Sequence, residues 1–219
     1  MCATIADVKA IDVARDERRD ICDLFMEVGP DAPTLCGTWT TRDLAAHLVV
    51  RESRPDAAVG ILIRPLARHT ESVQANIAAR PWSHLVASVR TGPPVFSPFR
   101  LPGVQGLANP FEFVIHHEDV RRAQPQWEPR DLSAAEQAVI WGRLAKAARL
   151  LARSSPVGVV LRRSDTGESA VAKSGMPAVT LTGEPLELLL RLYGRRAVIL
   201  DVEGSEDVVQ RFESASFGV

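Results

Sequence analysis

The sequence changes character at Pro156, and this change constrains the fold of the chain more than any other feature. Before Pro156, apolar residues recur at the three- and four-residue spacing of amphipathic helices. After it, short β-branched or alternating runs bounded by Gly and Asp are typical of strands. We therefore predict a helical domain over residues 1–153, followed by a small α+β domain over residues 156–219.

Short connections between several amphipathic helices favour a bundle, so the expected fold class is mainly α with an α+β tail. The expected helices of the first domain cover residues 8–28, 40–51, 66–79, 82–89, 109–122 and 133–153. The expected strands of the second domain cover residues 157–162, 169–173, 178–182 and 197–202, with helices near 184–193 and 205–213.

Composition excludes several classes of function. With 219 residues and 46% hydrophobic content, the chain can bury a substantial core. It has no apolar run near the length of a membrane span and no leader-like start, so we expect a cytoplasmic protein without a membrane partner. The net charge of −1 gives no basic excess, which argues against nucleic acid as a partner.

The three cysteines have no C-x-x-C spacing, so neither a disulfide framework nor a thiolate zinc knuckle is indicated. Cys22 stands in a helical apolar pattern and is expected to be a small core residue. Cys36 is expected in a loop, and nothing near it in the sequence would activate its thiol. We therefore assign no catalytic thiol.

Candidate chemistry concentrates in the stretch NPFEFVIHHEDVRR, where Asn109 followed by Pro110 predicts the start of a helix. Glu112 and His116 are four residues apart, so their side chains lie one above the other and can hold two positions around one divalent cation. An alternative stays open, because Glu112 stands three residues after Asn109, where a capping-box Glu belongs. The run after it would then be a solvated helix face.

A third ligand has to come from another helix. His47 lies in the apolar stripe of the helix that starts at Thr40, so it is expected to face inward. An inward His is more often a core residue than a ligand, unless a Glu/His pair from a second helix faces it in a bundle. Both interpretations of His47, as a core residue and as a metal ligand, remain open.

Two neighbours of His116 have alternative roles. Asp119 lies on the same stripe and either accepts the free ring N–H of His116 or pairs with Arg122. His117 points about 100° away from the stripe, so it is expected beside the site or at the surface rather than as a ligand.

Three segments in combination resemble the mycothiol-dependent maleylpyruvate isomerase superfamily. They are WTTRDLAAHL from Trp39, the E-x-x-x-H-x-x-D-x-x-R pattern from Glu112, and GEPLELLLRLYGR from Gly183. The run HHEDVRRAQP from His116 is similar, more narrowly, to an actinobacterial subgroup of metal-binding proteins without an assigned reaction. The resemblance extends over nearly the whole chain.

This resemblance implies a DinB-like four-helix bundle followed by a small sterol-carrier-like α/β domain. It also implies a metal site whose ligands here are His47, Glu112 and His116. Two His and one carboxylate leave a fourth position open, as in catalytic zinc sites. Zn²⁺ is the preferred metal, and Ni²⁺ and Fe²⁺ are alternatives because the same ligand types suit them.

The function that follows from the resemblance is a thiol-dependent transferase or isomerase with mycothiol as co-substrate. Its partners would be a low-molecular-weight thiol and a small electrophilic substrate, and a homodimer is left open. The alternative is a non-catalytic, metal-dependent small-molecule binding protein. Arg191, Arg195 and Arg196 are candidates to hold an anionic substrate, although solvated surface is the expected interpretation.

Overall fold

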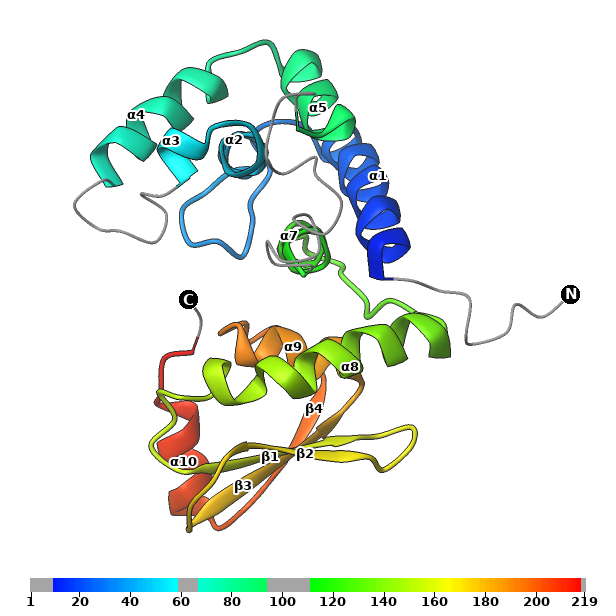
Figure 1. The fold of residues 1–219 in the computed structure, drawn as a ribbon, viewed down its shortest axis with the longest axis vertical. Helices are drawn as coiled ribbons and strands as arrows, with labels where there is room; N and C mark the ends of the chain where they lie inside the picture. Colours follow the sequence, from blue (N-terminus) through cyan, green and yellow to red (C-terminus); the bar gives the residue numbers. More distant parts are fainter. Residues whose placement is uncertain (1–9, 59–66, 94–110, 218–219) are drawn as a thin grey trace, which may run out of the picture. The chain divides into compact units, whose positions relative to one another are not determined.

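The computed structural model describes residues 10–58, 67–93 and 111–217, which form a mixed α/β fold (Figure 1). The chain divides into two compact units at the step from Glu128 to Pro129. We call residues 10–128 the helical unit and residues from Pro129 onward the sheet unit. Within the described parts of the chain, no helix is long and apolar enough to cross a membrane.

The helical unit is built from amphipathic helices that surround one apolar core. Its described elements are α1 (Ala10–Val28), α2 (Thr41–Ser53), the single turn α3 (Pro55–Ala58), α4 (Ala67–Ala78), α5 (Trp82–Thr91) and α7 (Glu112–Arg121). Helix α1 packs against α5 and α7, and α2 packs against α4 and α5. The fully buried side chains of Phe25, Leu44 and Leu85 belong to this core, and buried Cys22 joins it as predicted.

Local sequence explains where these helices begin and end. Thr40 caps α2, because its hydroxyl accepts from the Asp43 N–H while the Asp43 side chain accepts from the Thr40 N–H. Gly29 ends α1 in a left-handed conformation with φ 82°, which favours glycine. Helix α7 begins at Glu112, and its N-cap residue Phe111 makes no side-chain capping bond. Asn109 and Pro110, the predicted start, lie outside the described residues.

The sheet unit contains four strands in the order β2-β1-β3-β4. Strand β1 (Gly158–Arg163) pairs antiparallel with β2 (Ser169–Lys173) and parallel with β3 (Ala178–Gly183), and β3 pairs antiparallel with β4 (Leu200–Glu203). Burial alternates along β3, where Val179 and Leu181 point into the core, as the alternating sequence predicts.

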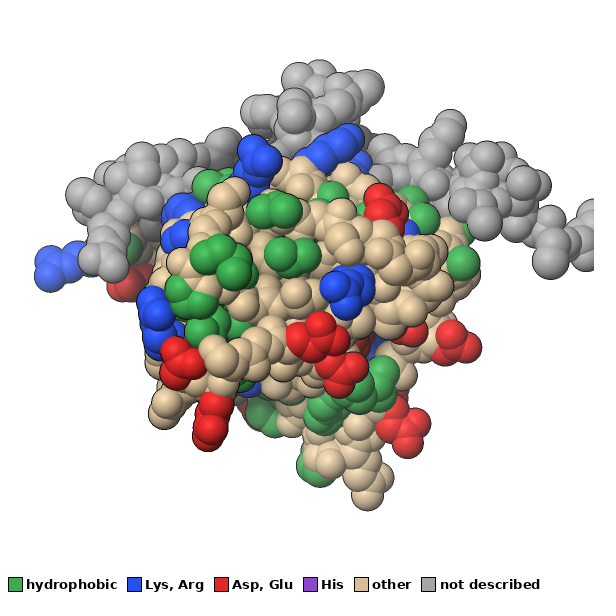
Figure 2. Space-filling view, turned by 90° about the horizontal axis from the view of Figure 1, so that it is seen from below, with side chains coloured by type: hydrophobic (Ala, Val, Ile, Leu, Met, Phe, Trp, Pro, Cys, Tyr) green, Lys and Arg blue, Asp and Glu red, His purple; other side chains and the backbone are tan. Residues whose placement is uncertain are grey.

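Three helices complete this unit. They are α8 (Ala134–Leu151), α9 (Pro185–Leu192) and α10 (Glu206–Glu213). Helix α8 packs against α9 and β2, while α9 and α10 both contact β3, so α8 and α9 lie along the sheet (Figure 1). Lys/Arg and Asp/Glu side chains are interspersed on the face shown in Figure 2.

The position of α8 differs from our prediction. Residues 133–153 were expected to complete the helical domain, but the division falls before α8, and the helix packs against the sheet unit's own elements. Its capping box at Ser133 and Glu136 forms as predicted. Gln137 then fixes α8 to α9, because its amide donates to Glu184 (2.8 Å) and accepts from the Leu186 N–H (3.2 Å).

Candidate metal centre

Helix α2 carries the first candidate ligand, His47. The capping box at Thr40 and Asp43 fixes the start of the helix, and His47 follows one turn after Asp43. His47 stands between the buried residues Leu44 and Leu48 and is itself 7% exposed. The inward orientation predicted from the apolar stripe is therefore confirmed.

Helix α7 carries the other two candidates, Glu112 and His116. Glu112 is the first residue of the helix, where a carboxylate interacts favourably with the free N–H groups of the first turn. It is buried, with 8% of its surface exposed. His116 follows one turn later, so its side chain stacks on that of Glu112.

The three side chains converge on one point. Nε2 of His47 lies 3.3 Å from Oε1 of Glu112, and Nε2 of His116 lies 3.1 Å from the same oxygen. One ligand atom from each residue lies within 4.8 Å of the other two. Bonds of about 2.0–2.1 Å in a tetrahedral zinc site separate its ligand atoms by about 3.3 Å, so these distances fit such a site.

Arg51 and burial set the charges of this group. Arg51, one turn after His47 on α2, lies 3.2 Å from Oε2 of Glu112. Burial alone would raise the pKa of Glu112, but its contacts with His116 and His47 and the Arg51 charge outweigh burial and hold that pKa well below its usual range. Burial lowers the pKa of His47, so its imidazole is neutral at pH 7 and has a lone pair to offer.

His116 has a carboxylate oxygen facing each of its ring nitrogens. Nε2 faces Glu112, and Nδ1 lies 2.9 Å from Oδ2 of Asp119, which is fully buried. Burial by itself would lower the pKa of His116. Its contacts with Asp119, Cys36 and Glu112 raise the pKa by more than burial lowers it, so the pKa lies well above its usual value.

A neutral imidazole has only one N–H and cannot satisfy a carboxylate on both sides. The arrangement is favourable when a second proton, or a cation bound at Nε2 in place of a proton, lies between the ring of His116 and Glu112. The residues therefore fit a divalent cation, both in donor chemistry and in spacing.

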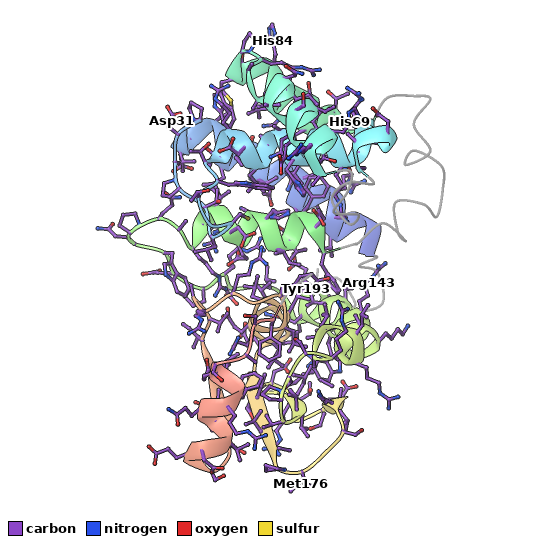
Figure 3. The ribbon with its side chains drawn as sticks, turned by 90° about the vertical axis from the view of Figure 1, so that its left-hand side faces the viewer. Asp31, His69, His84, Arg143, Met176 and Tyr193 are labelled. Atoms are coloured by element: carbon purple, nitrogen blue, oxygen red, sulfur yellow. The ribbon has the colours of Figure 1, made fainter. Side chains whose placement is uncertain are left out.

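The structure also decides between the alternatives for the neighbouring residues. Asp119 lies against the ring nitrogen of His116, while the Arg122 Nε–H donates to Glu118 at 2.5 Å. His117 is buried, and its Nδ1 lies 2.7 Å from Oε2 of Glu17 on α1, so the surface interpretation is wrong. His69 and His84, which are labelled in Figure 3, are exposed, and neither belongs to a candidate metal group.

Sequence reasoning placed neither Cys36 nor Trp39, two residues of the loop before α2, at the site. The Cys36 thiol lies 3.1 Å from Oδ2 of Asp119 and 3.7 Å from Nδ1 of His116. The ring of Trp39 lies 5.2 Å from that of His47, at a tilt of 49°. A backbone bond from Leu35 N–H to the Asp119 carbonyl (2.9 Å) brings the loop to α7, and no local pattern indicates such a bond.

A pocket opens beside His47, between the loop, α2 and α4. Its volume is about 420 Å³, within the range of sites for small molecules. The side chains that border it include Trp39, Asp43, His47, Thr70, Glu71 and Gln74. A molecule in this pocket would lie against one of the three candidate metal ligands.

No family model, curated protein or solved structure that was compared with this chain matches it. The resemblance to the isomerase superfamily therefore stays a prediction, and the assignment of the metal centre depends on its own geometry.

Proposed function

We propose that His47, Glu112 and His116 bind a divalent cation, and that the protein uses this metal as a thiol-dependent transferase or isomerase. One observation carries the proposal. Two imidazole nitrogens from different helices approach the same buried carboxylate oxygen at 3.3 and 3.1 Å.

Zn²⁺ is the metal that we propose, with Ni²⁺ and Fe²⁺ as alternatives, because two His and one carboxylate suit all three. Three protein ligands leave a fourth position for a thiol or water. A metal bound there supplies Lewis acidity, which lowers the pKa of the thiol or water that it holds.

The surrounding side chains keep the ligands in place. Asp119 orients the ring of His116 through Nδ1, so that Nε2 faces the metal position. Arg51 contacts Oε2 of Glu112, which leaves Oε1 directed at the two histidines. Because both groups are fixed before a metal arrives, little conformational entropy is lost on binding.

The thiol part of the proposal depends on the resemblance of the three sequence motifs, which also implies a DinB-like bundle over residues 1–153 and a sterol-carrier-like domain over residues 156–219. Mycothiol is then the co-substrate, and a small electrophile is the second substrate. The pocket beside His47, with a volume of about 420 Å³, would take one of them next to the metal. The same pocket also supports the alternative, a non-catalytic protein that binds a small molecule in a metal-dependent way.

Metal analysis by plasma mass spectrometry tests the metal site first. Dialysed wild-type protein supplied with zinc should retain metal, and His47→Ala and Glu112→Gln should each retain about one equivalent less, as loss of a ligand from an open site predicts. His84→Ala, which removes an exposed histidine, is the matched control and should retain as much as the wild type. Wild-type protein that stays metal-free overturns the proposal.

A second experiment separates the enzyme from the binding protein. Cobalt-loaded wild-type protein should change its visible spectrum when mycothiol is added, and mycothiol should then accelerate the isomerisation of maleylpyruvate. Glu112→Gln should show neither effect. A spectral change with no reaction of this or other small electrophiles favours the binding protein, and no spectral change contradicts a thiol at the metal.

A further inference from the structure

A second group of ligand types lies on the other side of His116. It consists of the Cys36 thiol, Nδ1 of His116 and Oδ2 of Asp119, all within 4.8 Å of one another. The sulfur lies 3.1 Å from the carboxylate oxygen and 3.7 Å from the ring nitrogen, and these last two atoms are 2.9 Å apart. Thiolate, imidazole and carboxylate are all zinc ligands.

These separations are close to those of a bound cation. In a tetrahedral site with a Zn–S bond of about 2.3 Å, sulfur lies about 3.6 Å from the neighbouring ligand atoms. The S–N separation of 3.7 Å already fits such a site, and the S–O separation of 3.1 Å has to widen by about half an ångström.

Backbone and hydroxyl bonds hold Cys36 in this position. The Leu35 N–H donates to the Asp119 carbonyl at 2.9 Å, which ties the loop to the last turns of α7. Thr34 then shapes the loop, since its hydroxyl accepts from the Cys36 N–H (3.1 Å) and donates to the Trp39 carbonyl (2.8 Å). The thiol is thus directed at α7 by the fold of its loop.

Each ring nitrogen of His116 faces one carboxylate and one further ligand type. Nε2 faces a carboxylate of Glu112 and a further ligand, His47. Nδ1 faces a carboxylate of Asp119 and a further ligand, Cys36. Asp119 is fully buried, and a buried carboxylate requires a compensating positive charge or hydrogen bonds.

We propose that Cys36, His116 and Asp119 form a second metal position for a soft or borderline divalent cation such as Zn²⁺ or Cd²⁺, with His116 bridging the two metals. The charges balance when both positions are filled. Two dications carry four positive charges, and their ligands, namely the carboxylates of Glu112 and Asp119, the Cys36 thiolate and the bridging imidazolate, carry four negative charges, with the Arg51 cation beside Glu112 outside this count. Filling the second position releases the thiol proton and the remaining ring proton of His116.

Cobalt titration of the full chain tests this proposal, because a thiolate bound to Co²⁺ gives an intense near-ultraviolet charge-transfer band. Wild-type protein should bind two equivalents of Co²⁺ and show the charge-transfer band. Cys36→Ser should lose the band and one equivalent but keep the visible bands of the first position. Cys2→Ser and Cys22→Ala are matched controls and should keep the charge-transfer band.

His47→Ala is the complementary variant, and it separates this proposal from the first metal position. It should lose one equivalent of Co²⁺ and retain the charge-transfer band, whereas Cys36→Ser should lose one equivalent together with that band. If the wild type binds one equivalent of Co²⁺ with a charge-transfer band, and His47→Ala binds the same amount with the same band, the first position is overturned and the second is supported. One equivalent without the band, unaffected by Cys36→Ser, would overturn the second position and leave Cys36 and Asp119 as supports for the His116 ring.

X-ray absorption of the wild type with two equivalents of zinc gives a measurement that needs no variant. A sulfur neighbour at about 2.3 Å, averaging one for every two zinc ions, supports the second position. A zinc environment of nitrogen and oxygen alone overturns it.

Discussion

Helices α7 and α9 are both buried along most of their length, yet they are made of different residues. All eight residues of α9 are buried, and five of them are leucine. Helix α7 also buries eight residues, but Glu112, His117, Glu118 and Asp119 are among them, with His116 half-buried between. One buried helix is therefore mainly apolar, and the other is rich in ionisable groups.

The partners of the charged residues show what this difference means. In α9, Glu187 accepts the Ile199 N–H at 2.8 Å, and Arg191 pairs with Glu213 at 2.9 Å, so each charge stabilises the sheet unit itself. In α7, Glu112 and Asp119 both face the ring of His116. Buried charge is costly, and apolar residues would stabilise a helix at least as well. Glu112, His116 and Asp119 therefore form a candidate binding site, whereas His117 and Glu118 of the same helix pair within the helical unit.

The largest effect on stability is expected from Glu118, a buried carboxylate of α7 that lies outside the two candidate metal groups. Its buried carboxylate accepts from Arg122 at 2.5 Å and from Arg121 at 3.1 Å. Glu118→Ala leaves the buried Arg122 guanidinium without this partner, so we expect the free energy of unfolding to fall by about 3–5 kcal/mol. Urea unfolding followed by circular dichroism measures the change.

Glu128→Ala, which removes an exposed carboxylate of the same unit, is the control for Glu118→Ala and should change stability by less than about 0.5 kcal/mol. Equal effects of the two substitutions would mean that the buried charges of α7 are unimportant for the fold. The difference between the buried charged residues of α7 and those of α9 would then be smaller than we infer.

In α9 the expected effect is purely one of packing. Leu189 is fully buried, and Leu189→Ala should lower the free energy of unfolding by about 3 kcal/mol through lost apolar contacts and a cavity. Leu150→Ala, at an exposed leucine of α8, is the matched control. Plasma mass spectrometry on the folded variant should find the wild-type metal content, and a loss of metal would contradict the separate roles of the two helices.

Local patterns predicted most of the helices and strands, but not which elements pack together. The periodicity around Ile140 and Leu144 and the cap at Ser133 establish α8, yet neither shows that the sheet is its partner. Arg191 was expected to be solvated. It is buried, because its guanidinium stacks on Phe212 and pairs with a residue of α10 that is distant in sequence.

The candidate site likewise has a part that the sequence could predict and a part that it could not. Glu112 and His116 share one helix face through local geometry, and the inward stripe of α2 added His47, so the first group was accessible to sequence reasoning. Cys36 was not, because its approach to α7 depends on hydrogen bonds between residues more than eighty positions apart. Long-range contacts of this kind have no periodic signature.

The smallest expected effect concerns an ion pair of the sheet unit, where the carboxylate is partly exposed. Arg163 donates to both oxygens of Asp165 at 2.9 and 2.6 Å, and this hydrogen bonding lowers the pKa of Asp165. A carboxyl with a lowered folded-state pKa adds stability above its unfolded pKa of about 3.9, and that stability is lost as the pH falls through the folded value.

Asp165→Asn should therefore lower the free energy of unfolding at pH 7, but by no more than about 1 kcal/mol, because solvent screens a side chain that is 39% exposed. The difference between wild type and variant should shrink from pH 5 toward pH 3 as the wild-type carboxyl is protonated, and urea unfolding at each pH measures it. A difference that is the same at pH 7 and pH 3 would show that the charge of Asp165 does not stabilise the unit. A loss as large as that of Glu118→Ala would remove the contrast between the buried charges of α7 and the partly exposed pairs of the sheet unit.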